Sequence, residues 1–450
     1  MNDENTPPVA PPTGPAPDHI RIPHARPIQP IPVSKDGQQF VALRDPAMLV
    51  NQSMVVNPGA MGLVQQFQGE LAIEDIADKF VPVDQVQDPE KRSEIIERLT
   101  GEIRALAEGM DKFGLLWGPT FNDLENKRAE ALATAGAFPV SASGSLVMLA
   151  QQLDTESEPP SEDSDKIAWA RDLTDRTIQK WLEEAEDPEF DTPPMGLVVP
   201  HLDYSKAHEV YASAYRSWDG VAAPDRVVIL GTNHFGMGDG VVMSRYGFDT
   251  PLGRVRPDTD VVEKLGNALG DRLFKDELDL APEHSIELHL PFIQKLFGDV
   301  PVVAALMPDP TQPLLEDDGG RVSWKEFVDT CTGIISESGG VTYFVASADL
   351  SHVGPQFGEP KAVDSERKEE VERHDREMIG HYLANNQDSF IEAMEWSKNP
   401  THWCSIGNME ATAKISQVED IELLDYRQAV DDQGTALVSV ASIALFGAES

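Results

Sequence analysis

Short apolar runs alternate with amphipathic segments through the C-terminal half of this chain. The apolar runs have the length and β-branched content of buried strands, whereas the segments between them repeat apolar residues at steps of three and four. Strands are predicted at 196–200, 226–230, 301–306, 341–347 and 435–440, and helices at 205–217, 259–269, 323–337, 362–385 and 407–417. This alternation predicts an α/β domain over 193–450, with a central, largely parallel sheet flanked by helices.

The first 192 residues follow other patterns. The proline-rich stretch 1–34 favours solvated, extended backbone, so it is predicted to be a disordered tail. From 35 to 120, a strand at 40–43 and helical spacing at 71–80 precede a longer helix that opens at Asp88-Pro89. These elements predict a small N-terminal α+β module. Residues 121–192 then form a helical connector, with an acidic linker at 154–165.

Composition restricts the partners. The chain has 36 basic and 77 acidic residues, a formal charge of −41, which repels nucleic acid and anionic membranes and attracts cations. With 40% hydrophobic residues it can form a sizeable core, and it has only two cysteines, which suits a reducing compartment. Neither a secretion signal nor an apolar run of membrane-spanning length is evident. We therefore expect a cytoplasmic protein without nucleic-acid or membrane partners.

Histidines gather where the predicted strands end. Nine of the eleven histidines lie between His201 and His402, and His201, His234 and His352 each follow a strand-like run. In an open α/β sheet the carboxyl ends of the parallel strands border one crevice, so distant residues can meet there. Because neutral imidazole is the commonest protein ligand of zinc, copper and iron, these histidines predict a metal or catalytic site.

A second histidine pair, His284 and His289, lies in the segment Glu-His-Ser-Ile-Glu-Leu-His. A spacing of five residues separates two side chains by about 140° on a regular helix, so the pair does not match the helical zinc motif. One of the two is expected to line the pocket while the other orients a neighbour. Glu287, between them, is a candidate general base or a carboxylate that holds an imidazole.

Asp349 and Cys404 complete the candidate set. Asp349 lies three residues before His352, in what is expected to be a tight turn after a strand, where it either caps backbone N–H groups or faces the site. Cys404 precedes a predicted helix, whose N-terminus would stabilise a thiolate and make it a soft metal ligand. Cys331, inside a helical apolar pattern, is expected to be inert.

These residues stand in a recognisable order. Pro-His at 200–201, Gly-Thr-Asn-His at 231–234, Glu-His-Ser-Ile-Glu-Leu-His-Leu-Pro at 283–291 and Ser-Ala-Asp-Leu-Ser-His at 347–352 resemble the Memo-like family, which is similar in fold to the class III extradiol dioxygenases. Those dioxygenases bind non-haem iron through two histidines and a carboxylate. The resemblance implies that His201 and His234 are metal ligands, that His352 with Asp349 is an acid/base or ligand-binding element, and that a cysteine is the third ligand.

The chain departs from the family pattern at two places. Leu-Asp-Tyr follows His201 where the family usually has Ala-Gly-Tyr, and alignment on Ile-Gly at 406–407 puts Thr401 where the family cysteine is expected. The third ligand is then either Cys404 or His402. The N-terminal module, at 36–43 and 69–76, resembles the PqqD-like domains, small winged-helix-type folds, which implies a peptide or protein partner.

Three functions follow as hypotheses. The first is an oxidoreductase with iron or copper at His201, His234 and either Cys404 or His402, acting on an unknown small molecule, with His352 moving protons. The second is a non-catalytic module that binds a peptide or protein in the same crevice. The third is a zinc-dependent hydrolase with Glu287 as its general base.

Overall fold

The structure is a computed structural model that describes residues 17–447 except 36, 47, 49, 51–52, 83–85, 155–156, 237–238 and 313–319. The chain divides into two compact units, Met1–Glu130 and Ala131–Ser450. Each unit has its own core and is described by itself.

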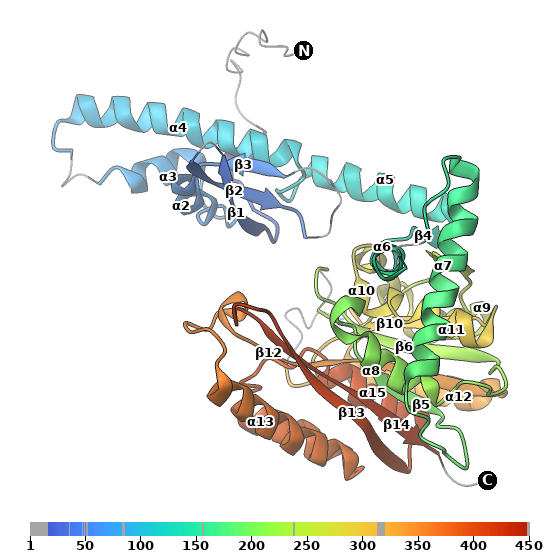
Figure 1. The fold of residues 1–450 in the computed structure, drawn as a ribbon. Helices are drawn as coiled ribbons and strands as arrows, with labels where there is room; N and C mark the ends of the chain where they lie inside the picture. The colour runs from blue at the N-terminus through green and yellow to red at the C-terminus, as the bar shows by residue number, and fades with distance from the viewer. Residues whose placement is uncertain are drawn as a thin grey trace. The chain divides into compact units, whose positions relative to one another are not determined.

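The N-terminal unit is a three-stranded antiparallel sheet with helices packed on it (Figure 1). Leu43 and Val56 of the sheet share a core with Ile73, Ile103 and Met110 of the helices. Asp88 caps the longest helix by accepting hydrogen bonds from two backbone N–H groups, and Pro89 begins it. The elements are α1 (Asp18–Arg21), β1 (Gln29–Lys35), β2 (Gln38–Arg44), β3 (Met54–Val56), α2 (Met61–Val64), α3 (Ile73–Phe80) and α4 (Pro89–Lys112).

This unit confirms the small N-terminal module predicted from the sequence. Its beginning differs from the expected proline-rich tail: residues 1–16 lie outside the described part, but 29–35 form β1. Proline is tolerated there because β1 is at the edge of the sheet, where a missing N–H breaks no ladder on the open side. The PqqD-like resemblance stays a prediction.

Several helices lead into the C-terminal unit. α5 (Pro119–Ala135) crosses the boundary between the units, and β4 (Ala137–Phe138), α6 (Gly144–Leu153) and α7 (Asp163–Glu184) follow. β4 belongs to a small sheet of order β4-β8-β9, with β8 at Gly247–Thr250 and β9 at Gly253–Val255. Of the predicted connector 121–192, α6 and α7 lie within the C-terminal unit and pack in its core, and the last residues of the predicted acidic linker, 163–165, begin α7.

A mixed eight-stranded sheet organises the C-terminal unit, with the order β12-β14-β5-β11-β6-β10-β7 and β13 paired to β14. β5, β11, β6 and β10 are parallel neighbours, whereas the outer strands pair antiparallel. The predicted α/β architecture is confirmed, with parallel strands at the centre of a mixed sheet. The strands are β5 (Gly196–Val199), β6 (Arg226–Thr232), β7 (Val242–Met243), β10 (Val302–Met307), β11 (Thr342–Ser347), β12 (Asp349–Val353), β13 (Asp420–Val430) and β14 (Leu437–Phe446).

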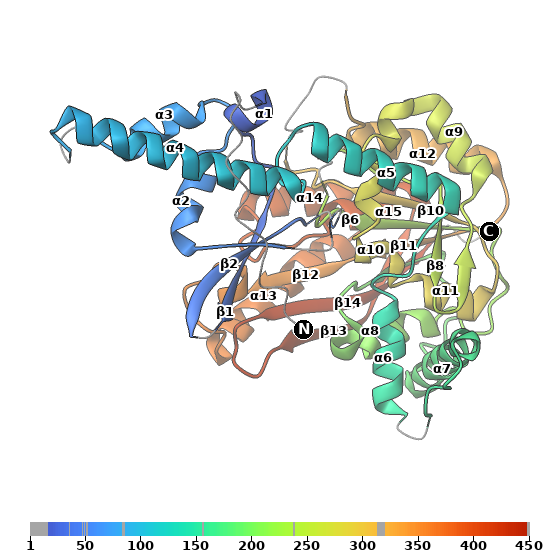
Figure 2. The same cartoon turned by 90° about the horizontal axis from the view of Figure 1, so that it is seen from above.

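Helices cover both faces of this sheet (Figures 1 and 2). Alternate residues of each central strand point to opposite faces: Val227 and Ile229 pack with α7, α8 and α11, whereas Val228 and Leu230 pack with α9, α12 and α15. Burial on both faces explains why these strands appear in the sequence as continuous apolar runs. The helices are α8 (Tyr204–Arg216), α9 (Thr259–Leu269), α10 (His284–Glu287), α11 (Leu290–Phe297), α12 (Trp324–Ser338), α13 (Ser365–Leu383), α14 (Gln387–Ser397) and α15 (Ile406–Ser416).

One local expectation is wrong. Asp349 and His352 do not lie in a turn, because 349–353 form β12, which pairs antiparallel with β14 and has a register shift between these two residues. The run Asp-Leu-Ser-His-Val is short, and its adjacent polar residues Ser351 and His352 break the apolar-polar alternation, so it gives little strand signal without its partner strand. Within the described residues, no helix has both the length and the apolar character needed to cross a membrane.

Replacement of Trp218 tests the packing of the core on the face of the sheet that α8 covers. It is fully buried, and its ring lies 5.0 Å from that of Tyr343 and 5.7 Å from that of Phe297. We expect Trp218→Ala to lower the free energy of unfolding by about 3–5 kcal/mol, because the cavity cannot close fully. Trp396→Ala is the matched control and should change it by less than about 0.5 kcal/mol, since Trp396 is 90% exposed. Urea unfolding of the full chain, followed by tryptophan fluorescence, measures both; equal effects would contradict this packing.

Candidate metal centre

Three adjacent parallel strands deliver polar residues to one edge of the sheet. β5, β11 and β6 are neighbours in that order, and their carboxyl ends lead directly to His201, Asp349 and His234. Asp349 Oδ1 accepts hydrogen bonds from the backbone N–H groups of His201 (2.8 Å) and Leu202 (3.1 Å). The carboxylate thereby joins the ends of β5 and β11, and His201 is fixed beside them.

The short helix α10 brings His284 to the same edge. Ser285 Oγ accepts a hydrogen bond from Thr232 N (3.0 Å) and donates one to Thr232 O (2.9 Å), which ties α10 to the end of β6. Only glycine fits at position 231, since a Cβ there would lie 2.5 Å from Ser285 Oγ. The Gly-Thr-Asn-His and Glu-His-Ser motifs therefore contact each other directly in the folded chain.

His201, His234 and His284 form a group whose candidate ligand nitrogens all lie within 4.8 Å of one another. Their ring centroids are 4.9 Å apart for His201 and His234, 5.4 Å for His201 and His284, and 4.8 Å for His234 and His284. His201 is buried, whereas the side chains of His234 and His284 are 22% and 28% exposed. The group is thus anchored in the protein on one side and reachable from solvent on the other.

Each of the three rings has a partner on its Nδ1 atom. His201 Nδ1 lies 2.9 Å from Ser347 Oγ, and the Nδ1 atoms of His234 and His284 each lie 3.1 Å from Glu283 Oε1. Metal-binding histidines characteristically hold their second nitrogen in this way, which fixes the tautomer and the ring orientation. The arrangement leaves Nε2 on each ring for a ligand, so the residues present fit a metal ion.

Glu283 is the carboxylate that organises this group. Its side chain is 1% exposed, and it accepts hydrogen bonds from the backbone N–H groups of His234 (2.7 Å), His284 (2.8 Å) and Ser285 (2.8 Å) as well as contacting both rings. Although burial alone would raise it, the pKa of Glu283 is held well below its usual range by the hydrogen bonds to His234 and His284. Glu283 is therefore a buried anion that compensates positive charge at the edge.

The imidazoles respond to this field in opposite directions. Burial, reinforced by the neighbouring His234 and His284, lowers the pKa of His201 well below its ordinary value. Burial also opposes protonation of His234, but hydrogen bonds to Cys404 and Glu283 outweigh it and raise the pKa of His234 well above that value. His201 therefore favours the neutral form that a metal ligand requires, whereas His234 favours its protonated form and would have to release a proton to bind a metal.

Cys404 lies beside the group, in the loop before α15. Its Sγ lies 3.4 Å from His201 Nε2, 3.1 Å from Ser405 Oγ and 3.7 Å from the carbonyl oxygen of Asp349. The second carboxylate oxygen of Asp349, Oδ2, lies 3.8 Å from His201 Nε2. Asp349 therefore accepts hydrogen bonds from backbone N–H groups through Oδ1 and faces the site through Oδ2. Of the two alternatives for the third ligand, Cys404 contacts His201, whereas His402 contacts the carbonyl oxygen of His352.

His402 and His352 lie beside the group and outside it. His402 is exposed, with its Nδ1 3.2 Å from the carbonyl oxygen of His352. His352 is half-buried, donates from Nδ1 to the carbonyl oxygen of Leu350 (3.0 Å) and packs edge-on against Phe357. Burial lowers the pKa of His352, although Asp349 opposes this effect. A neutral imidazole with Nδ1–H bonded keeps Nε2 free to accept a proton.

Glu287 and His289 have partners away from the histidine group. Glu287 accepts hydrogen bonds from the backbone N–H groups of residues 141–143 and from Ser143 Oγ, so it anchors the chain before α6. His289 is fully buried, with its Nδ1 3.0 Å from the hydroxyl of Tyr215. Both residues thus lie in structural contacts, and the orienting role considered for Glu287 is occupied by Glu283.

Sequence reasoning did not single out Glu283, Ser347 or Asn408. Asn408, on α15, donates to Thr232 Oγ1 (2.8 Å) and to the carbonyl oxygen of Ser347 (2.7 Å), and so ties α15 to β6 and β11. Glu283 had no clear N-cap signal in the sequence, because glutamate is not among the residues preferred at that position. Ser347 and Asn408 had none either, because Ser347 reaches the site through the pairing of β5 with β11 and Asn408 through the packing of α15 against β6 and β11.

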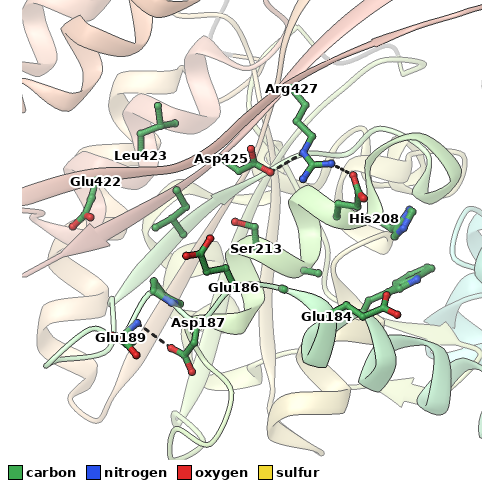
Figure 3. A pocket seen from close by; sticks show the side chains of 16 residues that line it. Glu184, Glu186, Asp187, Glu189, His208, Ser213, Glu422, Leu423, Asp425 and Arg427 are labelled. Atoms are coloured by element: carbon green, nitrogen blue, oxygen red, sulfur yellow. Dashed lines mark hydrogen bonds and ion pairs between the residues drawn. The ribbon is translucent and has the colours of Figure 1, made fainter.

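A separate cavity of about 600 Å³ lies elsewhere in the C-terminal unit (Figure 3). It is bordered by Trp181, His208 and Arg427 and by seven carboxylates: Glu184, Glu186, Asp187, Glu189, Glu209, Glu422 and Asp425. Arg427 pairs with Glu209 and Asp425. The cavity shares no residue with the histidine group.

The burial of His289 predicts a pH effect on stability. Burial, aided by His284, lowers its pKa to about 3, so the unfolded chain takes up a proton near pH 6.5 while the folded protein stays neutral. The free energy of unfolding is therefore undiminished by His289 above pH 6.5, and it decreases as pH falls from 6.5 towards 3 because only the unfolded chain binds the proton. At pH 5 this one imidazole lowers the free energy of unfolding by about 2 kcal/mol relative to its value above pH 6.5.

We expect His289→Gln to remove this part of the pH dependence while keeping a polar partner for Tyr215. Urea unfolding of the metal-free protein at pH 7, 6 and 5 measures the difference between variant and wild type. His381→Gln, on α13, is the control. Parallel pH profiles for wild type and His289→Gln would show that His289 does not titrate as described.

Comparison with known proteins agrees with the geometry. Residues 170–445 match the family model described as Memo-like protein. A MEMO1 family protein of Pyrobaculum arsenaticum is 34% identical over 173 residues, 37% of this chain and 57% of that protein, and one of Thermotoga neapolitana is 33% identical over 44% of this chain and 67% of its own length. One of Aquifex aeolicus is 26% identical over 81% of this chain and 84% of its own. The chain thus spans little more than half of the Pyrobaculum relative. Because the family model covers most of the C-terminal unit, including every residue of the histidine group, the chain belongs to the Memo-like family.

Proposed function

We propose that this protein is a metal-dependent oxidoreductase whose iron or copper ion is held by His201, His234, His284 and Cys404. One observation carries the proposal: three imidazoles converge within 4.8 Å, and each has its Nδ1 atom occupied by a partner in the protein. A cluster of histidines formed for packing alone would not need all three rings oriented in this way.

The donor set favours iron, copper or zinc over magnesium or calcium. Imidazole nitrogen and thiolate sulfur are ligands for copper, iron and zinc, whereas magnesium and calcium prefer oxygen. Iron or copper in such a site would supply oxygen activation or electron transfer. The 22% and 28% exposure of His234 and His284 gives a small molecule access from the solvent side.

His352 is the candidate proton carrier. Its Nδ1 hydrogen is committed to the carbonyl oxygen of Leu350, and its lowered pKa keeps Nε2 unprotonated at neutral pH. Asp349 supports it electrostatically and holds the backbone of His201 at the same time. Cys404 would bind as the thiolate and supply the negative charge that three neutral imidazoles lack.

The hydrolase hypothesis has weaker support. It requires a general base near a zinc-bound water, and Glu287, the residue considered for that role, is occupied by backbone N–H groups of residues 141–143. The hypothesis of a binding module remains the outcome to adopt if the protein takes up no metal. A peptide or protein partner for the N-terminal unit is proposed on the PqqD-like resemblance alone.

The proposal predicts the metal content of purified protein. Elemental analysis of tag-free protein prepared without oxygen should find close to one iron or copper per chain, and His201→Ala or His234→Ala should abolish it by removing a donor. His381→Ala, on α13 and outside the histidine group, is the matched control and should keep its metal. Folded wild type that takes up neither iron nor copper on titration would refute the metalloenzyme, and stoichiometric zinc alone would favour the hydrolase.

A further inference from the structure

The loop between α14 and α15 carries Cys404 and runs beside β12, which carries His352. The backbone N–H of His352 donates to the carbonyl oxygen of Thr401 at 2.7 Å. The loop itself bends through left-handed conformations at Lys398 (φ 60°), Asn399 (φ 46°) and His402 (φ 57°). Non-glycine residues adopt such angles at a cost, so surrounding contacts must hold this loop in place.

Asp375, on α13, is the centre of those contacts. Its side chain is fully buried, and its Oδ1 lies 2.5 Å from Ser351 Oγ and accepts a hydrogen bond from Trp403 Nε1 at 2.9 Å. Its Oδ2 accepts one from the hydroxyl of Tyr426 at 2.8 Å. Ser351 Oγ also lies 2.7 Å from Thr401 Oγ1, so the network reaches the loop at two points.

The network touches the residues directly next to the functional side chains. Trp403 precedes Cys404 in the loop, and Ser351 precedes His352 in β12. A fully buried carboxylate is costly unless its oxygens are satisfied, and here both oxygens have donors from three different segments. An asparagine would keep only one acceptor oxygen: if that oxygen faces Trp403 Nε1, the NH2 group faces the Tyr426 hydroxyl, which must then give up its donor role.

We propose that Asp375 is a positioning residue of the metal centre. By holding the indole of Trp403 and the hydroxyl of Ser351, it fixes Cys404 Sγ against His201 Nε2 and sets His352 beside the histidine group. The role as a positioning residue for a metal rests on the proposed function. The placement of the thiol rests only on the contacts above and can be tested without metal.

Alkylation of Cys404 in metal-free protein tests the placement. Iodoacetamide modification at pH 7.5, followed by mass spectrometry of the Cys404 peptide, should be about tenfold faster in Asp375→Asn than in wild type, because the loop opens locally. Cys331, which is fully buried, serves as the internal control for global unfolding. Glu369→Gln makes the same charge change at an exposed position of α13 and should leave the rate unchanged.

Trp403→Phe provides a second variant if Asp375→Asn does not fold, since it removes the indole N–H and keeps an aromatic ring. It should also accelerate alkylation of Cys404 while Cys331 stays protected. In protein loaded with Cu(II), both variants should weaken or shift the sulfur-to-copper charge-transfer band. Folded variants with wild-type alkylation rates and a lower melting temperature alone would overturn the inference.

The two proposals fail in different ways. If wild type binds no metal but Asp375→Asn still exposes Cys404, the network positions the thiol and the metalloenzyme proposal is wrong. If wild type binds copper through Cys404 with the same band and affinity in both variants, the metal centre stands and Asp375 has only a structural role.

Discussion

The buried carboxylate of Glu283 is the interaction on which the arrangement of this site depends. It caps α10, holds the backbone of His234 and contacts the Nδ1 atoms of both His234 and His284. An anion buried to this degree is stable only when such donors surround it. Two of these donors are the rings of His234 and His284. The hydrogen bonds that Glu283 accepts therefore also set the orientation of these two candidate ligands. Folding of α10 against β6 thereby brings the candidate ligands His234 and His284 together.

The rest of the fold brings the segments that carry these residues together. Parallel pairing of β5, β11 and β6 puts three carboxyl ends side by side, and the close contact of Gly231 with Ser285 lets α10 approach them. Asn408 ties α15 to β11, and the loop before α15 brings Cys404 to His201. Donors from four separate segments therefore meet at one edge of one sheet, as the topology of open α/β sheets allows.

The sequence predicted the central strands well because they are buried on both faces and leave a continuous apolar signal. The stretch expected at 226–230 is β6, Arg226–Thr232, and the helix expected at 259–269 is α9, Thr259–Leu269. His201, His234 and Cys404 could be found because they follow strands or precede a helix. Glu283, Ser347 and Asp375 could not be assigned, since their roles arise from hydrogen bonds between segments far apart in the chain. β12 was missed for the same reason: its pairing with β14 is decided by the fold and leaves little trace in five residues.

The most direct test of this account is a crystal structure of the metal-loaded protein with anomalous scattering measured at the iron and copper absorption edges. The account predicts one strong anomalous peak, from an ion that the Nε2 atoms of His201, His234 and His284 bind at about 2.0–2.1 Å and Cys404 Sγ binds at about 2.3 Å. These distances are typical of transition-metal ligands. Glu283 should keep its contacts to the Nδ1 atoms of His234 and His284. A peak outside the histidine group, or none in protein saturated with metal, would contradict the account.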